Sequence, residues 1–138
     1  MSIVKQILLY PMAALYGTAG VMHFVSPGFF VEIMPSYLPL HLELVYLSGA
    51  IEILLAILLL IPATRRLAAW GTIALLIAVF PANLNMALND IRPDGPFGPP
   101  TTFALWMRLP MQLVLIAWAW WYTRDARERA PVSRLRAA

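Results

Sequence analysis

Four uninterrupted apolar stretches of about 20 residues occupy most of this 138-residue chain. They are Ile3–Phe24, Leu42–Ile61, Leu67–Leu88 and Phe103–Tyr122. A helix of about 20 residues is about 30 Å long, which matches the hydrocarbon thickness of a bilayer. Because 61% of the residues are hydrophobic and only 12% are charged, a soluble domain of this size would leave too much apolar surface exposed to water. The sequence therefore predicts an all-α membrane protein, a bundle of four transmembrane helices.

The four stretches leave no room for a separate soluble domain. We expect one transmembrane domain over residues 1–123, followed by a basic tail over residues 124–138. The first stretch carries only Lys5 before its apolar core and is longer than the core of a typical signal peptide, which predicts a retained helix. The chain has no cysteine, which excludes disulfide exchange and thiolate-held metal or iron–sulfur sites formed by its own residues.

The basic residues gather on one side of the predicted bundle if the four helices zigzag across a membrane. They are Lys5, Arg65, Arg66, Arg124, Arg127, Arg129, Arg134 and Arg136. The opposite loops hold Glu32, Glu43, Asp90 and Asp94 against the single Arg92. The positive-inside rule therefore predicts that both termini are cytoplasmic. The tail lies next to a membrane-spanning helix, so orientation and contact with anionic lipid explain its charge better than nucleic acid, and no nucleic-acid partner is expected.

The two loops on the acidic side differ from short helix connections. Ser26 and Pro27 are a favourable helix start, and Phe29, Phe30, Ile33 and Met34 follow at helical spacing. This pattern predicts a short interfacial helix in the first outer loop, ended by Pro35 and Pro39. The second loop, DIRPDGPFGPPT, is rich in proline and glycine and is predicted to be an irregular, lid-like segment.

Six polar side chains interrupt the apolar helices, all in the central or outer part of the predicted bundle. They are His23, Glu52, Asn83, Asn85, Arg108 and Gln112. Placing an ionised group in hydrocarbon costs roughly several kcal/mol of free energy unless the group is paired or hydrated. Such residues are therefore candidates for ligand binding or proton relay. Pro81 and Pro110 lie beside them and are expected to kink their helices and to free the carbonyls of Ile77 and Trp106.

Small residues on the same faces predict that these polar groups point into the bundle, because small side chains let helices approach closely. On the third predicted helix the small and polar stripe consists of Gly71, Ala74, Ala78, Ala82, Asn85 and Asn89. On the first helix it consists of Ala13, Tyr16, Gly17, Gly20 and His23, and on the second of Ser48, Glu52 and Ala56 with Gly49 beside them. On the fourth it consists of Ala104, Arg108, Gln112 and Ala119.

The same polar residues also have structural interpretations that need no ligand. Glu52 and Arg108 can be an ion pair that locks two helices together, and the asparagines can bridge helices. His23 can be an interface residue or a proton carrier, and His41 is expected in a loop. A haem held by both histidines is disfavoured because they lie near the same surface at adjoining helix ends. We expect no metal site, no catalytic residue and no intrinsic cofactor.

Several strings in the chain resemble the DoxX family of small bacterial four-helix membrane proteins. They are GTAGVMHFVSPGFFVEIMPSYLP, SGAIEILLAILLLIPATRRLAAWG and VFPANLNMAL, together with the Arg-x-Pro-x-Gln of the fourth helix. The resemblance implies a bacterial inner membrane protein in which His23, Glu52, Asn83, Arg108 and Gln112 match the family's polar motif positions. Family members include a membrane subunit of a thiosulfate:quinone oxidoreductase and a membrane partner in an oxidative-stress complex, and more distant animal relatives assist receptor assembly. The absence of cysteine means that no thiol-based role carries over.

Three functions remain open from the sequence. The first is an accessory subunit of a redox complex that binds a quinone or another small molecule, with Glu52 as proton acceptor and a protein partner supplying the electron carrier. The second is a structural or assembly subunit whose polar residues only fix helix packing. The third is a small transporter or proton-conducting homo-oligomer, which is disfavoured because no inverted repeat is visible.

Overall fold

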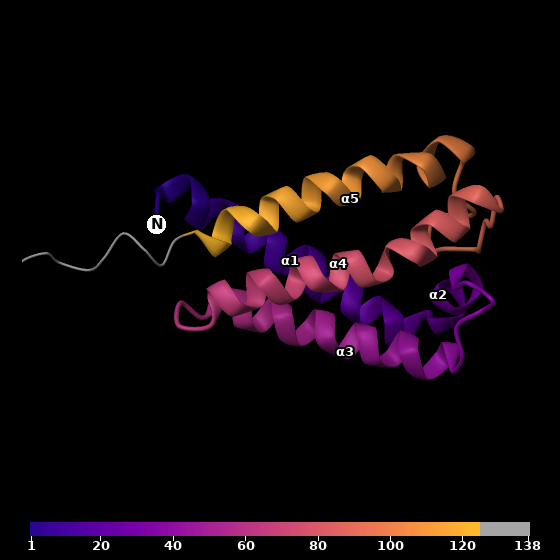
Figure 1. The fold of residues 1–138 in the computed structure, drawn as a ribbon, viewed down its shortest axis with the longest axis horizontal. Helices are drawn as coiled ribbons and strands as arrows, with labels where there is room; N and C mark the ends of the chain where they lie inside the picture. Colours follow the sequence, from indigo (N-terminus) through magenta and orange to yellow (C-terminus); the bar gives the residue numbers. More distant parts are fainter. Residues whose placement is uncertain (125–138) are drawn as a thin grey trace, which may run out of the picture.

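The computed structural model describes residues 1–124, and the basic tail predicted beyond Arg124 lies outside the described residues. The described part is helical throughout, without a β-strand, and its elements in chain order are α1 (Ile3–Val25), α2 (Pro27–Ile33), α3 (His41–Leu60), α4 (Arg65–Leu88) and α5 (Thr102–Thr123). Each of α1, α3, α4 and α5 is long and apolar enough to cross a membrane. The predicted bundle of four transmembrane helices is confirmed, with the short helix α2 between the first two (Figure 1).

The long helices pack in the order α1, α3, α4 and α5. Their main core is formed by buried residues that include Met12 and Tyr16 of α1, Leu59 of α3, Leu76 of α4 and Ala119 of α5. Large apolar side chains on the outer faces stay exposed, as in Ile7, Ile57, Ile77 and Leu113. A bundle in lipid has no reason to bury them, because lipid tails are as apolar as the side chains themselves.

The chain start, the α3–α4 turn and the end of α5 lie at one end of the bundle, which we call the basic end (Figure 1). There the Lys5 ammonium donates to the carbonyl oxygen of Trp121 at 2.8 Å, and the Tyr122 hydroxyl donates to the Lys5 carbonyl oxygen at 2.8 Å. Arg65 donates to the Leu59 carbonyl at 2.8 Å, which satisfies a free carbonyl at the end of α3. The two bonds of Lys5 tie α5 to α1 at this end, and the bond of Arg65 ties α4 to α3.

Helices α1 and α3 approach so closely that two glycines are required. A Cβ added at Gly20 would lie 2.7 Å from the carbonyl oxygen of Gly49, and one added at Gly49 would lie 2.5 Å from the Cβ of His23. Real Cβ atoms do not come so near to such neighbours. The predicted close packing of small residues on these two helices is therefore confirmed, and it brings His23 against the Glu52 side of α3.

The small-residue stripe predicted to face inward along α4 is wrong at Ala74 and Ala78, which are exposed. The buried face of α4 includes Thr72, Ile73 and Leu76 instead. The core between the helices needs the volume of Ile73 and Leu76. Alanines can face lipid without cost, because a hydrocarbon solvent does not favour burial of one apolar side chain over another.

The opposite end of the bundle, which we call the α2 end, is closed by α2 (Figure 1). This helix begins with Pro27 at its first turn and ends at Ile33, before Pro35, as the pattern predicts. Its Ile33 is buried with Met86 of α4 and Leu105 of α5. Helix α2 therefore packs part of its apolar face onto the end of the bundle.

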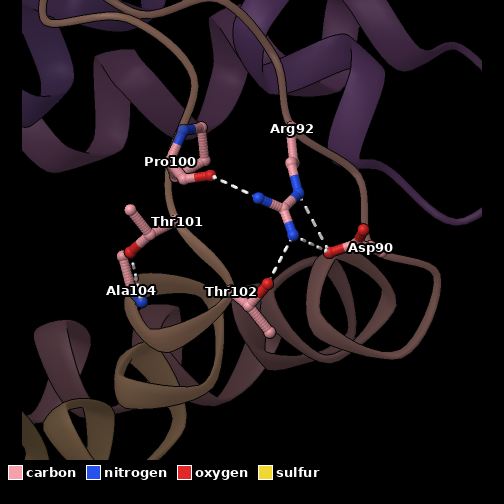
Figure 2. A network of polar contacts seen from close by, with 6 residues as sticks. All are labelled: Asp90, Arg92, Pro100, Thr101, Thr102 and Ala104. Carbon is pink, nitrogen blue, oxygen red and sulfur yellow. Dashed lines mark hydrogen bonds and ion pairs between the residues drawn. The ribbon is translucent and has the colours of Figure 1, made fainter.

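The irregular α4–α5 loop is fastened by hydrogen bonds at both ends (Figure 2). Helix α4 ends where Asp90 takes a left-handed conformation with φ 49° and the Ile91 amide donates to the Met86 carbonyl at 3.0 Å. The Arg92 guanidinium donates to the Asp90 carboxylate at 2.8 Å and to the hydroxyl of Thr102, the first residue of α5. The loop thus holds the ends of α4 and α5 at a set separation.

Candidate functional site

His23 of α1 and Glu52 of α3 lie side by side where the two glycines let their helices touch. Nδ1 of His23 is 3.2 Å from Oε2 of Glu52, and both side chains are largely buried. The same nitrogen is 2.7 Å from the Ala19 carbonyl oxygen, one turn earlier in α1. A carbonyl can only accept, so Nδ1 carries a hydrogen and donates it to Ala19.

Because that hydrogen is directed to Ala19, His23 does not donate it to Glu52. Oε2 of Glu52 is buried without a hydrogen-bond partner among residues 1–124. A buried oxygen in this condition is unusual, since most buried polar atoms have at least one partner. The carboxylate therefore keeps a free acceptor position inside the bundle.

Phe30 of α2 covers the imidazole of His23. The two rings are stacked with centroids 3.8 Å apart and planes inclined by 14°. Only 7% of His23 is exposed. Helix α2 therefore covers the His23 side of the His23–Glu52 pair at this end of the bundle.

Tyr16 is a further candidate residue that the sequence placed on a packing stripe without assigning a site role. It is 4% exposed and its hydroxyl is buried without a hydrogen-bond partner in the described part of the chain. Tyr16 lies on the same face of α1 as Gly20 and His23. This helical spacing is the sequence feature that could have identified Tyr16 as a site residue. Two packed helices, α1 and α3, thus each carry one buried oxygen without a hydrogen-bond partner among residues 1–124.

A second polar contact joins α4 to α5. The Asn83 amide donates to Oε1 of Gln112 at 3.0 Å, and the Gln112 amide donates to the carbonyl oxygen of Leu76. The sequence predicted a free carbonyl at Ile77 because of Pro81, but the carbonyl that Gln112 reaches is one residue earlier. Ile77 itself is 60% exposed, so its side chain lies outside the buried core. Asn83 and Gln112 are engaged with each other and with the backbone, as in a helix-bridging pair.

The remaining candidates contact α2. The Asn85 amide donates to the Ile33 carbonyl oxygen at 2.9 Å, and this bond satisfies a carbonyl at the end of α2. The Arg108 guanidinium lies 5.8 Å from the ring centroid of Phe29, within the range of a cation–π contact. Both residues therefore hold α2 against α4 and α5.

The interpretation of Glu52 and Arg108 as an ion pair is wrong, because the titratable side chain beside Glu52 is His23. Arg108 is on α5, which packs along α4, whereas Glu52 is on α3 at its contact with α1. The six candidates thus form separate groups: His23 with Glu52, Asn83 with Gln112, and Asn85 and Arg108 against α2. The expectation that His41 lies in a loop is wrong, because it is the first residue of α3, where its Nε2 lies 3.2 Å from the Pro35 carbonyl oxygen. Within residues 1–124, no group of three His, Asp or Glu side chains could hold a metal ion.

The fold and the site define a small four-helix membrane bundle with a polar pair at the contact of α1 and α3. A family model described as a domain of unknown function, DUF8561, matches residues 12–123. The chain therefore belongs to the DUF8561 family. No curated protein and no solved structure matches it.

Proposed function

We propose that this protein is an accessory subunit of a redox or respiratory-type membrane complex and binds a quinone, or another small carbonyl-bearing molecule, beside Glu52 and Tyr16. The observation that carries the proposal is the pair of buried oxygens, on two helices in contact, that lack hydrogen-bond partners in the described chain. Buried polar atoms are rarely left unpaired, because each costs about 1–3 kcal/mol. A bound molecule that pairs with both atoms removes this cost.

The chemistry of the two oxygens fits a quinone and its reduced form. The Tyr16 hydroxyl can donate to a quinone carbonyl, and the Glu52 carboxylate can accept from the hydroxyl of a quinol. Glu52 can also take up the proton that leaves when the quinol is oxidised. The imidazole of His23 stays beside Glu52 because its hydrogen bond to the Ala19 carbonyl fixes its orientation. The chain has no cysteine, so a partner protein supplies any thiolate-held electron carrier.

The resemblance to the DoxX family supports the same class of function, because its quinone-linked members are membrane subunits of this kind. On that basis we place the protein in a bacterial inner membrane. The basic end is proposed to face the cytoplasm, in agreement with the positive-inside rule. The His23–Glu52 pair then lies in the half of the bundle away from the cytoplasm or near its middle.

A structural or assembly role is the second candidate, and one observation favours it for part of the cluster. Asn83, Gln112 and Asn85 are all occupied by bonds between helices. They need no ligand to satisfy them. We therefore assign these three residues to packing and restrict the ligand proposal to the contact of α1 and α3. A transporter remains the less favoured alternative.

The proposal is tested with the full chain purified in lipid nanodiscs. Retained quinones are identified by mass spectrometry, and binding of decylubiquinone is measured by quenching of tryptophan fluorescence. Glu52→Gln keeps the shape of the side chain but removes the charged acceptor, so we expect binding to weaken about tenfold or more, since a hydrogen bond to a charged group contributes about 1.5–3 kcal/mol.

The matched control is Thr72→Val, which replaces a buried polar group of α4 whose hydroxyl already donates to the Ala68 carbonyl at 2.9 Å. It should leave decylubiquinone binding unchanged. Equal binding by the wild type and Glu52→Gln would reject the quinone site. If instead no quinone binds and Glu52→Gln lowers only the yield of a co-purifying protein, the structural role replaces the proposal.

A further inference from the structure

A cleft of about 360 Å³ opens at the basic end between the start of α4 and the end of α5, and its lining includes neither His23 nor Glu52. It is lined by Arg66 and Trp70 of α4 and by Trp120, Thr123 and Arg124 of α5. The first two turns of α4 and the end of α5 thus bring two arginines and two tryptophans together.

Within residues 1–124, the two arginines of the cleft have no anionic partner. Both are exposed, and neither has a carboxylate partner among residues 1–124. The guanidinium of Arg124 lies 3.6 Å from the ring centroid of Trp120, a stacked arrangement that leaves its N–H groups available at the edges. By contrast, Lys5 and Arg65 at the same end already donate to backbone carbonyls.

The charge distribution of the described chain favours an anion at this end. Apart from Glu52, its acidic residues lie in α2, at the start of α3 and in the α4–α5 loop, all at the α2 end: Glu32, Glu43, Asp90 and Asp94. No side chain in the described part therefore competes with an incoming anion for Arg66 and Arg124.

An apolar track leads from the cleft toward the middle of the bundle. On α4, Ala74 and Ile77 follow Trp70 at helical spacing, and on α5, Ala117 and Leu113 precede Trp120 at the same spacing. All of these side chains are exposed. Each row continues, on its own helix, from a tryptophan that lines the cleft, and its exposed side chains are open to lipid.

From the cleft and this track we infer that the basic end holds the headgroup of an anionic phospholipid. Arg66 and Arg124 bind the phosphate, which matches the planar fork of a guanidinium. Trp70 and Trp120 lie at the depth of the headgroup, where tryptophan is enriched, and the acyl chains follow the exposed track on α4 and α5. Basic clefts between helices on the cytoplasmic side commonly hold such lipids. A soluble phosphate would make no use of the track.

The experiment compares three probes on the full chain in detergent micelles: phosphatidylglycerol, phosphatidylcholine with the same acyl chains, and glycerol phosphate. Bound lipids are counted by native mass spectrometry, and affinity is measured by tryptophan fluorescence. We expect tight binding of phosphatidylglycerol and weaker binding of the other two. In the variant Arg66→Gln/Arg124→Gln, affinity for phosphatidylglycerol should fall about 30-fold, from the typical contribution of two basic residues near a membrane surface.

The control variant Arg127→Gln/Arg129→Gln removes the same charge from the sequence that follows Arg124, and it should change the affinity far less. The variant Arg66→Lys/Arg124→Lys keeps the charge and should bind at an intermediate strength, because an ammonium lacks the planar fork. Equal losses in the two glutamine variants would overturn the site in favour of general attraction. Glycerol phosphate that binds as tightly as the lipid would overturn the lipid as its ligand.

Discussion

Oε2 of Glu52 lies 3.2 Å from Nδ1 of His23, yet that nitrogen donates its hydrogen to the Ala19 carbonyl at 2.7 Å. The acid is therefore held beside a histidine without being satisfied by it. An ion pair that served only to join α1 and α3 would direct the imidazole hydrogen at the carboxylate. The arrangement instead keeps an acceptor oxygen open at the contact of two membrane-spanning helices.

Phe30→Ala tests whether α2 covers this pair. Removing the ring that stacks on His23 at 3.8 Å should admit water and small reagents to the imidazole. We expect faster modification of His23 by diethylpyrocarbonate, followed by peptide mass spectrometry. His41, the other histidine of the chain, is an internal reference whose rate should not change.

Phe97→Ala is the control for this experiment, because Phe97 is fully exposed in the α4–α5 loop, with a relative exposure of 102%. It should leave the reactivity of His23 unchanged. An unchanged rate in Phe30→Ala as well would mean that α2 does not limit access to the pair.

Gly49→Ala should separate α1 from α3. The added Cβ would lie 2.5 Å from the Cβ of His23 and 2.9 Å from the Gly20 carbonyl oxygen. Overpacking of this kind typically costs about 1–3 kcal/mol. The free energy of unfolding, measured by titration with sodium dodecyl sulfate in mixed micelles, should fall by that amount.

Gly17→Ala is the matched control on the same interface. Its added Cβ would meet the Cβ of Ala56 at 3.7 Å, an ordinary contact. We expect its unfolding free energy to stay within about 0.5 kcal/mol of the wild type, as for substitutions that create no steric conflict. Similar losses in both variants would contradict the close approach described for Gly20 and Gly49.

Tyr16→Phe and Tyr122→Phe remove the same hydroxyl from two buried tyrosines and should have different effects. The Tyr122 hydroxyl donates to the Lys5 carbonyl oxygen at 2.8 Å, so its loss should cost about 1 kcal/mol. The Tyr16 hydroxyl has no such bond within residues 1–124, so the ligand-free bundle should be unaffected or slightly more stable. Thermal unfolding in detergent distinguishes the two, and a clear loss in Tyr16→Phe would show that its hydroxyl is already paired.

Asn83→Leu and Gln112→Leu form a double-mutant cycle on the α4–α5 contact. Their direct hydrogen bond of 3.0 Å predicts a coupling energy of about 0.6–1.7 kcal/mol, the range found for such bonds in membranes. Gln112→Leu should be the more harmful single change because Gln112 also donates to the Leu76 carbonyl. Neither change should affect binding of decylubiquinone. A large effect on binding would mean that Asn83 and Gln112 belong to the ligand site.

Much of the architecture could be predicted because a membrane restricts helices strongly. The predicted stretch Leu42–Ile61 corresponds to α3 at His41–Leu60, and Phe103–Tyr122 corresponds to α5 at Thr102–Thr123. Hydrocarbon thickness sets the length of such helices, and loops between them stand out by composition. Pro27 and Pro35 likewise bracket the short helix α2.

The amino-acid sequence by itself thus determined the four spans, the short helix and the residues able to do polar chemistry. Only the tertiary structure decided that Glu52 lies against His23, that Asn83 pairs with Gln112, and that Ala74 and Ala78 face outward. The physical reason is that lipid is as apolar as a helix surface, so hydrophobicity does not report which face of a membrane helix is buried. Neighbours and rotations of the helices follow instead from steric fit, such as that of Gly20 against Gly49, and from the hydrogen bonds that packing allows.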